Sequence, residues 1–148
     1  MTPFAAPRTI DTLLARYSES HRHHTNELIH FLCVPVIVFS LLGLVWSLHP
    51  VAALVASAAA LYYYFRLSPP FAFGMLAMTL LMLALLAAMP RYTVLPVSIA
   101  VFVLAWMGQF VGHQIEGKKP SFFDDLRFLL IGPLFVLSFL YRRLRVAY

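Results

Sequence analysis

Four long apolar runs limit what this chain can fold into. They cover residues 31–48, 51–65, 71–89 and 93–111, and none of them contains a charged residue. A transmembrane helix needs about 20 mainly apolar residues, so the second run is short for a span and the others are long enough. Charged residues make up only 11% of the 148 residues, too few to cover a soluble domain. The sequence therefore predicts an all-α integral membrane protein, a four-helix bundle formed by a single domain over residues 1–148.

The segments on either side of these runs predict helices that do not cross the membrane. Residues 8–17 carry apolar side chains at helical spacing, which predicts an amphipathic helix on the membrane surface. Residues 121–141 contain a short apolar run interrupted by Gly132 and Pro133, which predicts a re-entrant or interfacial segment. Ser121 and Asp124 have capping-box spacing, so we expect a helix to begin there.

The distribution of charge predicts how the chain is oriented. Four crossings gather most basic residues on the side of the histidine-rich stretch, whereas the opposite loops hold only Arg91. The positive-inside rule makes the basic side cytoplasmic. The net charge of +5 favours membrane lipids as partners, and the scattered basic residues argue against nucleic acid. Because the chain is compact and shows no retention signal, we expect a bacterial inner membrane.

Histidines gather where two of the apolar runs meet the same membrane face. Four of the six histidines lie within residues 21–30, just before the first run, and His113 follows the fourth run. Neutral imidazole is the commonest protein metal ligand. His113 and Glu116 are three residues apart and share a helix face. Histidines with one carboxylate suit iron(II), although zinc or manganese would fit the same residues.

Helical spacing favours one pair among the clustered histidines. His23 and His30 are seven residues apart and nearly eclipsed on a helix, whereas His21 and His30 point to opposite sides of a continuous helix. His21 can join His30 only if the helix begins after His21, for example with Thr25 or Asn26 near its cap.

Two sequence blocks resemble those of a known family. The first block is Tyr17-x3-His21-x4-Asn26-x3-His30, followed by Cys33-x-Pro35. The second is Trp106-x2-Gln109-Phe110-x-Gly112-His113-x2-Glu116-Gly117-Lys118-Lys119-Pro120. Together they resemble the small membrane proteins related to the yeast 2-hydroxy fatty acid dioxygenase, and the resemblance extends over nearly the whole chain.

This resemblance implies an enzyme and a set of site residues. Family members are understood as iron(II)-dependent membrane enzymes that use molecular oxygen to shorten 2-hydroxy fatty acids by one carbon, an α-oxidation. The matching motifs make His21, His30, His113 and Glu116 the expected metal ligands. For His21 the motif opposes the spacing, and we follow the motif. His23 and His24 remain alternatives.

The resemblance and the placement of polar residues also suggest other roles. Glu116 is expected to act as a ligand or as a catalytic proton acceptor. We expect the substrate to contact the residues Asn26, Gln109, Lys118 and Lys119. Asn26 could instead cap a helix, and the two lysines could instead be positive-inside anchors.

Two further functions remain open at this point. A non-catalytic membrane protein could bind lipid or a partner, with its histidines holding a structural metal or none. A metal-dependent membrane hydrolase could use the same ligands. Gly108 and Gly112 form a GxxxG motif, which predicts close helix packing within the bundle or in a homo-oligomer.

Overall fold

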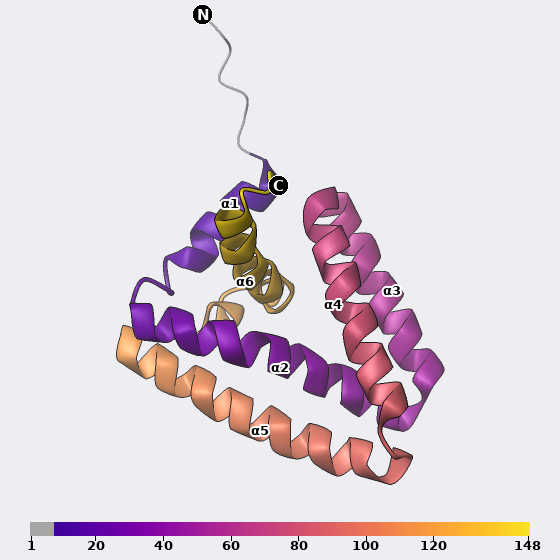
Figure 1. Cartoon of the computed structure of the whole chain (residues 1–148). Coiled ribbons are helices and arrows are strands. Elements are labelled where there is room, and N and C mark those ends of the chain that lie inside the picture. Colours follow the sequence, from indigo (N-terminus) through magenta and orange to yellow (C-terminus); the bar gives the residue numbers. More distant parts are fainter. Residues whose placement is uncertain (1–7) are drawn as a thin grey trace, which may run out of the picture.

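The computed structural model describes residues 8–148, and helices account for most of this part of the chain (Figure 1). The α-helices are α1 (Thr9–Ser18), α2 (His24–Leu48), α3 (Pro50–Leu67), α4 (Pro69–Ala88), α5 (Arg91–Glu116) and α6 (Phe128–Leu144), with a short 3-10 helix, η1 (Ser121–Phe123), before α6. Helices α2, α3, α4 and α5 are each long and apolar enough to cross a membrane. The predicted all-α class and four spans are therefore confirmed.

Two of these helices extend beyond the apolar runs that predicted them. Helix α2 begins at His24 rather than at residue 31, and α5 continues to Glu116 rather than ending at residue 111. The added turns carry His30 and His113. The polar turns therefore belong to the same rigid helices as the spans, which fixes the histidines relative to one another.

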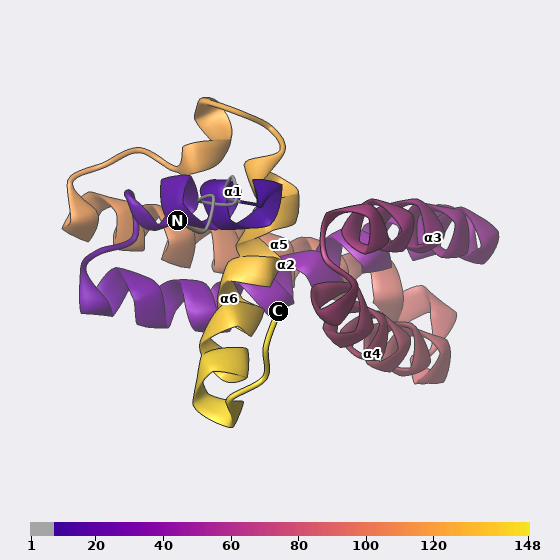
Figure 2. The same ribbon diagram turned by 90° about the horizontal axis from the view of Figure 1, so that it is seen from above.

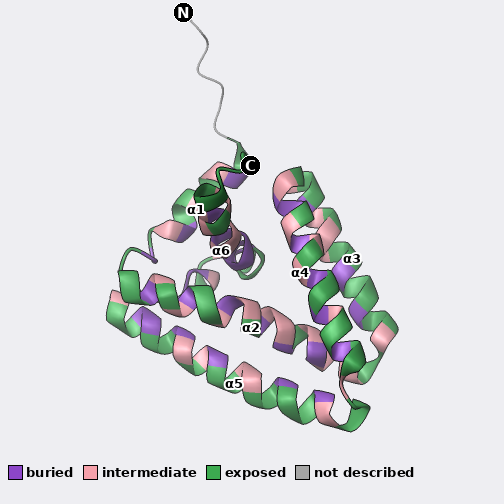
Figure 3. Cartoon of the chain, in the orientation of Figure 1, coloured by how far each residue is buried: buried purple, intermediate pink, exposed green. Residues whose placement is uncertain are grey.

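The four long helices are arranged as two antiparallel pairs. Helices α2 and α5 contact each other along much of their length, while α3 and α4 form a hairpin that meets the first pair at an angle (Figures 1 and 2). Exposed residues line the outer faces of all four helices (Figure 3). Many of these exposed side chains are large and apolar, as expected where a helix faces lipid.

Small residues bring α2 and α5 close together near the histidines. A Cβ atom added at Gly112 would collide with the side chain of Asn26, and one added at Gly108 would lie 2.9 Å from Cys33 Sγ. The GxxxG motif thus brings two helices of the same chain together, which is one of the two kinds of packing predicted for it. A homo-oligomer formed through the same glycines would need a face that α2 already covers.

Helix α1 packs against α6 and closes the end of the molecule that holds the histidines. Ile10, Leu13 and Tyr17 of α1 are buried in a cluster with apolar residues of α6, including Phe128 and Phe135. The amphipathic helix predicted at residues 8–17 is present, and its apolar face meets protein. Its placement on a membrane surface stays a prediction.

The segment after α5 differs from our expectation in two ways. No capping box forms, because Asp124 pairs with Lys119 at 2.8 Å, and α6 begins only at Phe128. Gly132 and Pro133 also do not interrupt α6, which is one helix from Phe128 to Leu144. The missing side chain of Gly132 lets α6 approach Tyr17 closely. A re-entrant or interfacial location of α6 stays a prediction.

Candidate metal centre

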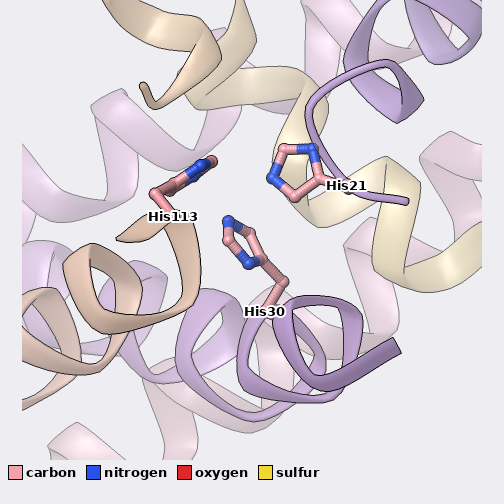
Figure 4. Close-up of side chains that lie close together, drawn as sticks. All are labelled: His21, His30 and His113. Carbon is pink, nitrogen blue, oxygen red and sulfur yellow. The ribbon is translucent and has the colours of Figure 1, made fainter. Parts of the chain in front are cut away.

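Three histidines from distant parts of the sequence meet at one end of the α2–α5 pair (Figure 4). His21 lies in the connector between α1 and α2, His30 on α2, and His113 in the last turns of α5. Each offers a ring nitrogen, and these nitrogens all lie within 4.8 Å of one another. The three side chains are no more than 5% exposed. This is the group of possible metal ligands found among residues 8–148.

Backbone carbonyls orient two of the three rings. His21 Nδ1 donates to the carbonyl oxygen of Tyr17 at 2.6 Å, and His30 Nδ1 donates to that of Asn26 at 2.9 Å. A carbonyl can only accept, so in both rings the proton lies on Nδ1 and the lone pair on Nε2. Metal-binding histidines are commonly held by this kind of hydrogen bond on the other ring nitrogen.

The cluster contains buried nitrogens that have no partner among the described residues. His21 Nε2 and His113 Nδ1 are both buried and make no hydrogen bond. A buried polar atom left without a partner costs about 1–3 kcal/mol. Three imidazoles with ring nitrogens this close together are a suitable donor set for iron(II) or zinc, so the residues present fit a metal ion.

Burial also keeps His21 in the form that binds metal. Loss of hydration lowers the pKa of His21 to about 4, although the hydrogen bond to Tyr17 opposes this shift. The nearby His113 lowers the pKa further, and Glu116 raises it. His21 is consequently neutral at physiological pH, so no proton has to leave before a cation binds.

The helix start explains why His21 joins the cluster and His23 does not. Helix α2 begins at His24, and His23 is its N-cap, with Nδ1 accepting a hydrogen bond from the amide of Thr25 at 3.2 Å. The helix therefore begins after His21, as pairing His21 with His30 requires. His24 is exposed, 3.9 Å from Glu27. The spacing-based preference for His23 is wrong, and neither His23 nor His24 enters the cluster.

Glu116 holds the connector that carries His21. Its Oε1 accepts from the amide of Arg22 at 3.0 Å, and its Oε2 accepts from the amide of His23 at 2.8 Å and from Asn26 Nδ2 at 3.2 Å. We expected a metal ligand or a proton acceptor here. The structure does not bring Glu116 into the ligand group, because its carboxylate binds the backbone of the connector instead.

Asn26 also helps to hold the connector that carries His21. Its side chain is fully buried, and Nδ2 also donates to the carbonyl of Ser20 at 3.1 Å. It is not the N-cap of α2, a position that His23 takes. Asn26 therefore links α2, the connector and the end of α5, whereas the substrate contact expected of it stays a prediction.

The remaining predicted site residues lie at two different depths. Gln109 is 4% exposed, lies one turn before His113, and has a buried Nε2 with no partner among the described residues. Lys118 and Lys119 are exposed at the rim, where Lys118 Nζ donates to the carbonyl of Glu19 at 2.8 Å and Lys119 pairs with Asp124. Only Gln109 thus faces the interior near the histidines.

Sequence reasoning missed the role of Tyr17. Its ring stacks on His21, with centroids 4.2 Å apart and planes inclined by 5°, and its carbonyl fixes the same imidazole. One pattern could have indicated this role. Tyr17 precedes His21 by four residues, just as Asn26 precedes His30, and both carbonyls accept from the histidine that follows.

A cavity of about 70 Å³ adjoins the cluster. His30, His113, Gln109 and Ser121 are polar residues of its lining. The rest of its wall is mainly apolar, with Val34, Ile37, Val38 and Leu41 from α2 and aromatic side chains from other segments. The site therefore joins possible metal ligands to a mainly apolar cavity.

Four helices suited to a membrane and a buried trio of histidines define a membrane protein with a candidate metal centre. Residues 8–144 match the family model described as 2-hydroxy-palmitic acid dioxygenase Mpo1-like, and the chain belongs to this family. It is 31% identical over 137 residues to the 2-hydroxy-palmitic acid dioxygenase MPO1 of Saccharomyces cerevisiae. That alignment covers 87% of this chain and 78% of the yeast protein. No solved structure matches the chain.

Membership supports the expected class of enzyme, a dioxygenase-like protein related to those acting on 2-hydroxy fatty acids. The yeast relative is eukaryotic, so it lends no support to the predicted bacterial inner membrane or to a cytoplasmic site.

Proposed function

We propose that this protein is an iron(II)-dependent membrane dioxygenase that shortens 2-hydroxy fatty acids by one carbon. One 2-hydroxy acid and one dioxygen would give the shorter fatty acid, carbon dioxide and water. The bond between C1 and C2 breaks, C1 leaves as carbon dioxide, and C2 becomes the new carboxyl carbon. Dioxygen accepts the electrons that both carbons lose, so the reaction needs no separate reductant.

One observation carries this proposal. Three buried imidazoles converge, and two of them, those of His30 and His113, line a cavity whose remaining wall is mainly apolar. A 2-hydroxy fatty acid has matching polarity, with a carboxylate and a hydroxyl at one end of an apolar chain. Family membership supports the same class of substrate.

His21, His30 and His113 would hold the iron. When bound, iron(II) supplies the redox centre and a template for orienting the reactants. Only three protein nitrogens meet in the cluster among the described residues, and a site with three protein ligands leaves coordination positions free for small molecules. The carbonyls of Tyr17 and Asn26 keep the ring lone pairs directed inward.

Other residues of the chain would bind the head of the substrate and exclude water. Gln109 Nε2 is buried and free to donate to an oxygen of the carboxylate or hydroxyl. Tyr17 and Phe128 line the cavity beside the histidines and keep its wall apolar. The exposed lysines Lys118 and Lys119 would attract the carboxylate to this end of the molecule without contacting it in the cavity.

The site would lie at the cytoplasmic face. Arg22, Lys118 and Lys119 lie at the end of the molecule that holds the histidines, and basic residues are enriched on the cytoplasmic side of membrane proteins. A cysteine introduced at Lys118 in the cysteine-free background Cys33→Ala would test this. It should react with an impermeant maleimide only after the cytoplasmic side is opened. Labelling in sealed cells would place the site on the other face.

Oxygen consumption separates this function from the two alternatives. Protein purified without oxygen and loaded with iron(II) should consume oxygen with 2-hydroxypalmitate and release pentadecanoic acid. Palmitate and 3-hydroxypalmitate, which lack the 2-hydroxyl group, should give neither. A hydrolase or a non-catalytic metal protein would consume no oxygen. Absence of oxygen uptake with every 2-hydroxy acid tested would overturn the proposal.

A further inference from the structure

One stripe of α2 forms a continuous wall leading away from the histidines. His30, Val34, Ile37, Val38 and Leu41 all line the cavity, and their spacing places them on one face of the helix. A helix rises about 1.5 Å per residue, so this wall is about 16 Å long from His30 to Leu41. The cavity therefore runs along α2 toward the opposite side of the membrane region.

A wider apolar groove continues this wall. The groove, of about 380 Å³, shares Val38, Leu41 and Leu129 with the cavity. Beyond them it is walled by Val45 of α2 and by residues of α3 and α4, including Ala56, Ala60 and Thr79. Leu41 is 43% exposed, so the groove opens sideways to the surroundings of the helices. The cavity and the groove adjoin at these shared residues, and together they are called the channel below.

We propose that the acyl chain of the substrate lies in this channel, with its end against Ala56 and Ala60 of α3. This inference rests on the proposed function for the identity of the head group. Small side chains at these two positions leave room between α3 and α2, where larger ones would close the groove. Ala56 and Ala60 are therefore the residues expected to set which chain lengths fit.

The length of the channel suits this occupant. The distance along α2 from His30 to Val45 is about 22 Å. Carbon–carbon bonds of about 1.5 Å give an extended acyl chain an advance of roughly 1.3 Å per carbon. A sixteen-carbon acid anchored at C1 and C2 would thus reach about 18 Å, close to the far end of the channel. The combined space also lies in the range of about 300–1,000 Å³ typical of small-molecule sites.

A second apolar groove also adjoins the cavity but is a poorer acyl site. It lies along α5 and is lined by Val103, Met107 and Phe110, among other apolar residues. Val103 and Met107 are 49% and 59% exposed. No residue of α3 or α4 covers this groove, whereas both helices wall the groove along α2. The α5 groove therefore supplies a control surface of similar polarity.

Chain-length preference tests the channel. Ala60→Phe fills the groove from the α3 side, and Val103→Phe makes the same kind of change in the α5 groove. For each variant we would measure the ratio of kcat/KM for 2-hydroxypalmitate to that for 2-hydroxyoctanoate. Ala60→Phe should lower this ratio roughly tenfold, since displacing two buried methylene groups costs about that factor. Val103→Phe should leave it unchanged.

Photocrosslinking gives a readout that does not depend on turnover. A 2-hydroxypalmitate probe with a diazirine near its methyl end, added to the full chain in nanodiscs, should label α2 near Val45 and α3 near Ala60. Ala60→Phe should reduce this labelling. Mass spectrometry of the peptides locates the labelled residues.

The possible outcomes test acyl binding in the channel and the proposed reaction separately. Labelling of α5 at Val103 or Met107, or an equal ratio for Ala60→Phe and wild type, would overturn the channel while oxygen uptake still supported the enzyme. Absence of oxygen uptake together with labelling of α3 would overturn the proposed reaction but leave an acyl-binding channel.

Discussion

The ring of Tyr17 lies flat against that of His21, 4.2 Å away between centroids, and its carbonyl accepts the Nδ1 proton of the same histidine. One residue of α1 thereby fixes both the plane and the tautomer of an imidazole in the connector. Tyr17 is itself buried against Phe128 and Phe135 of α6. The packing of α1 on α6 and the geometry of the histidine cluster are therefore linked through this one side chain.

Replacing Tyr17 should affect both stability and metal binding. Tyr17→Ala removes a buried aromatic ring, and comparable changes cost about 3–5 kcal/mol. It should also weaken iron binding, because His21 loses the surface that orients it. Tyr17→Phe keeps the ring and the carbonyl and is the matched control. Thermal unfolding in detergent and iron titration measure the two effects. Equal iron affinity in a folded Tyr17→Ala protein would contradict the orienting role.

Removing any one cluster histidine should abolish retention of iron. His30→Ala and His113→Ala each delete one of three converging nitrogens, and the folded protein should then lose its metal during purification. His23→Ala is the sharpest control, because this histidine is two residues from His21 but lies outside the cluster. His49→Ala should also be silent. Elemental analysis reports the result, and full iron content in His30→Ala or His113→Ala would exclude that ligand.

Glu116 should act on the metal indirectly, through the connector. Glu116→Ala removes the acceptor for the amides of Arg22 and His23, so these amides should exchange faster with deuterium. Iron affinity should fall about 10–100-fold, the usual effect of losing a group that supports a ligand. Glu116→Gln retains one oxygen acceptor and should show a smaller loss. If Glu116→Ala instead released all iron while the two amides stayed protected, a direct ligand role would be indicated.

Acid should destabilise the metal-free protein through His21. Its pKa is lowered from 6.5 to about 4 on folding, so protons bind more readily to the unfolded state. The resulting stabilisation is fully present above pH 6.5 and is lost as the pH falls toward 4, by up to about 3 kcal/mol. The groups that face His21 are Tyr17, His30, His113 and Glu116.

Denaturation of the chelator-treated protein across this pH range tests that expectation. His21→Gln should make the loss of stability at low pH smaller, whereas His49→Gln should leave it as in wild type. An equally steep loss of stability in His21→Gln would show that other groups cause it.

The two glycines of α5 should differ in their tolerance of a methyl group. A Cβ at Gly112 meets the buried amide of Asn26, which is held by Ser20 and Glu116 and has no room to move. A Cβ at Gly108 meets Cys33 Sγ, which can rotate away. Gly112→Ala should therefore destabilise the protein by about 1–3 kcal/mol, and Gly108→Ala by less. The reverse order in thermal unfolding would contradict this packing.

The spans were predictable from the sequence because hydropathy is a local property. Each apolar run corresponds to one helix, and Pro50 and Pro69 mark helix starts where proline is tolerated. The ends of α2 and α5 were not predictable in the same way. Their terminal turns are polar and helical, and only contact between the two helices explains the burial of Asn26 and His113 there.

The histidine cluster was predicted more fully than the contacts that hold it in place. His21, His30 and His113 were expected from the motifs, and the structure brings their nitrogens together. Helical spacing alone favoured His23, because the spacing of residues does not show where α2 begins. The position of Glu116 against the amides of Arg22 and His23 joins groups far apart in the sequence. No local pattern encodes such a contact, so Glu116 was assigned a role in the ligand sphere instead.

The wide separation of His30 and His113 along the chain has a consequence for biosynthesis. A nascent chain carries His21 and His30 early, but the third imidazole is synthesised only with the final turns of α5. Until that helix has entered the bilayer and packed against α2, a captured cation would be held by two nitrogens and would dissociate readily. Under the proposed function, insertion of the last long helix would time the maturation of the centre, and incompletely inserted chains would not retain reactive iron.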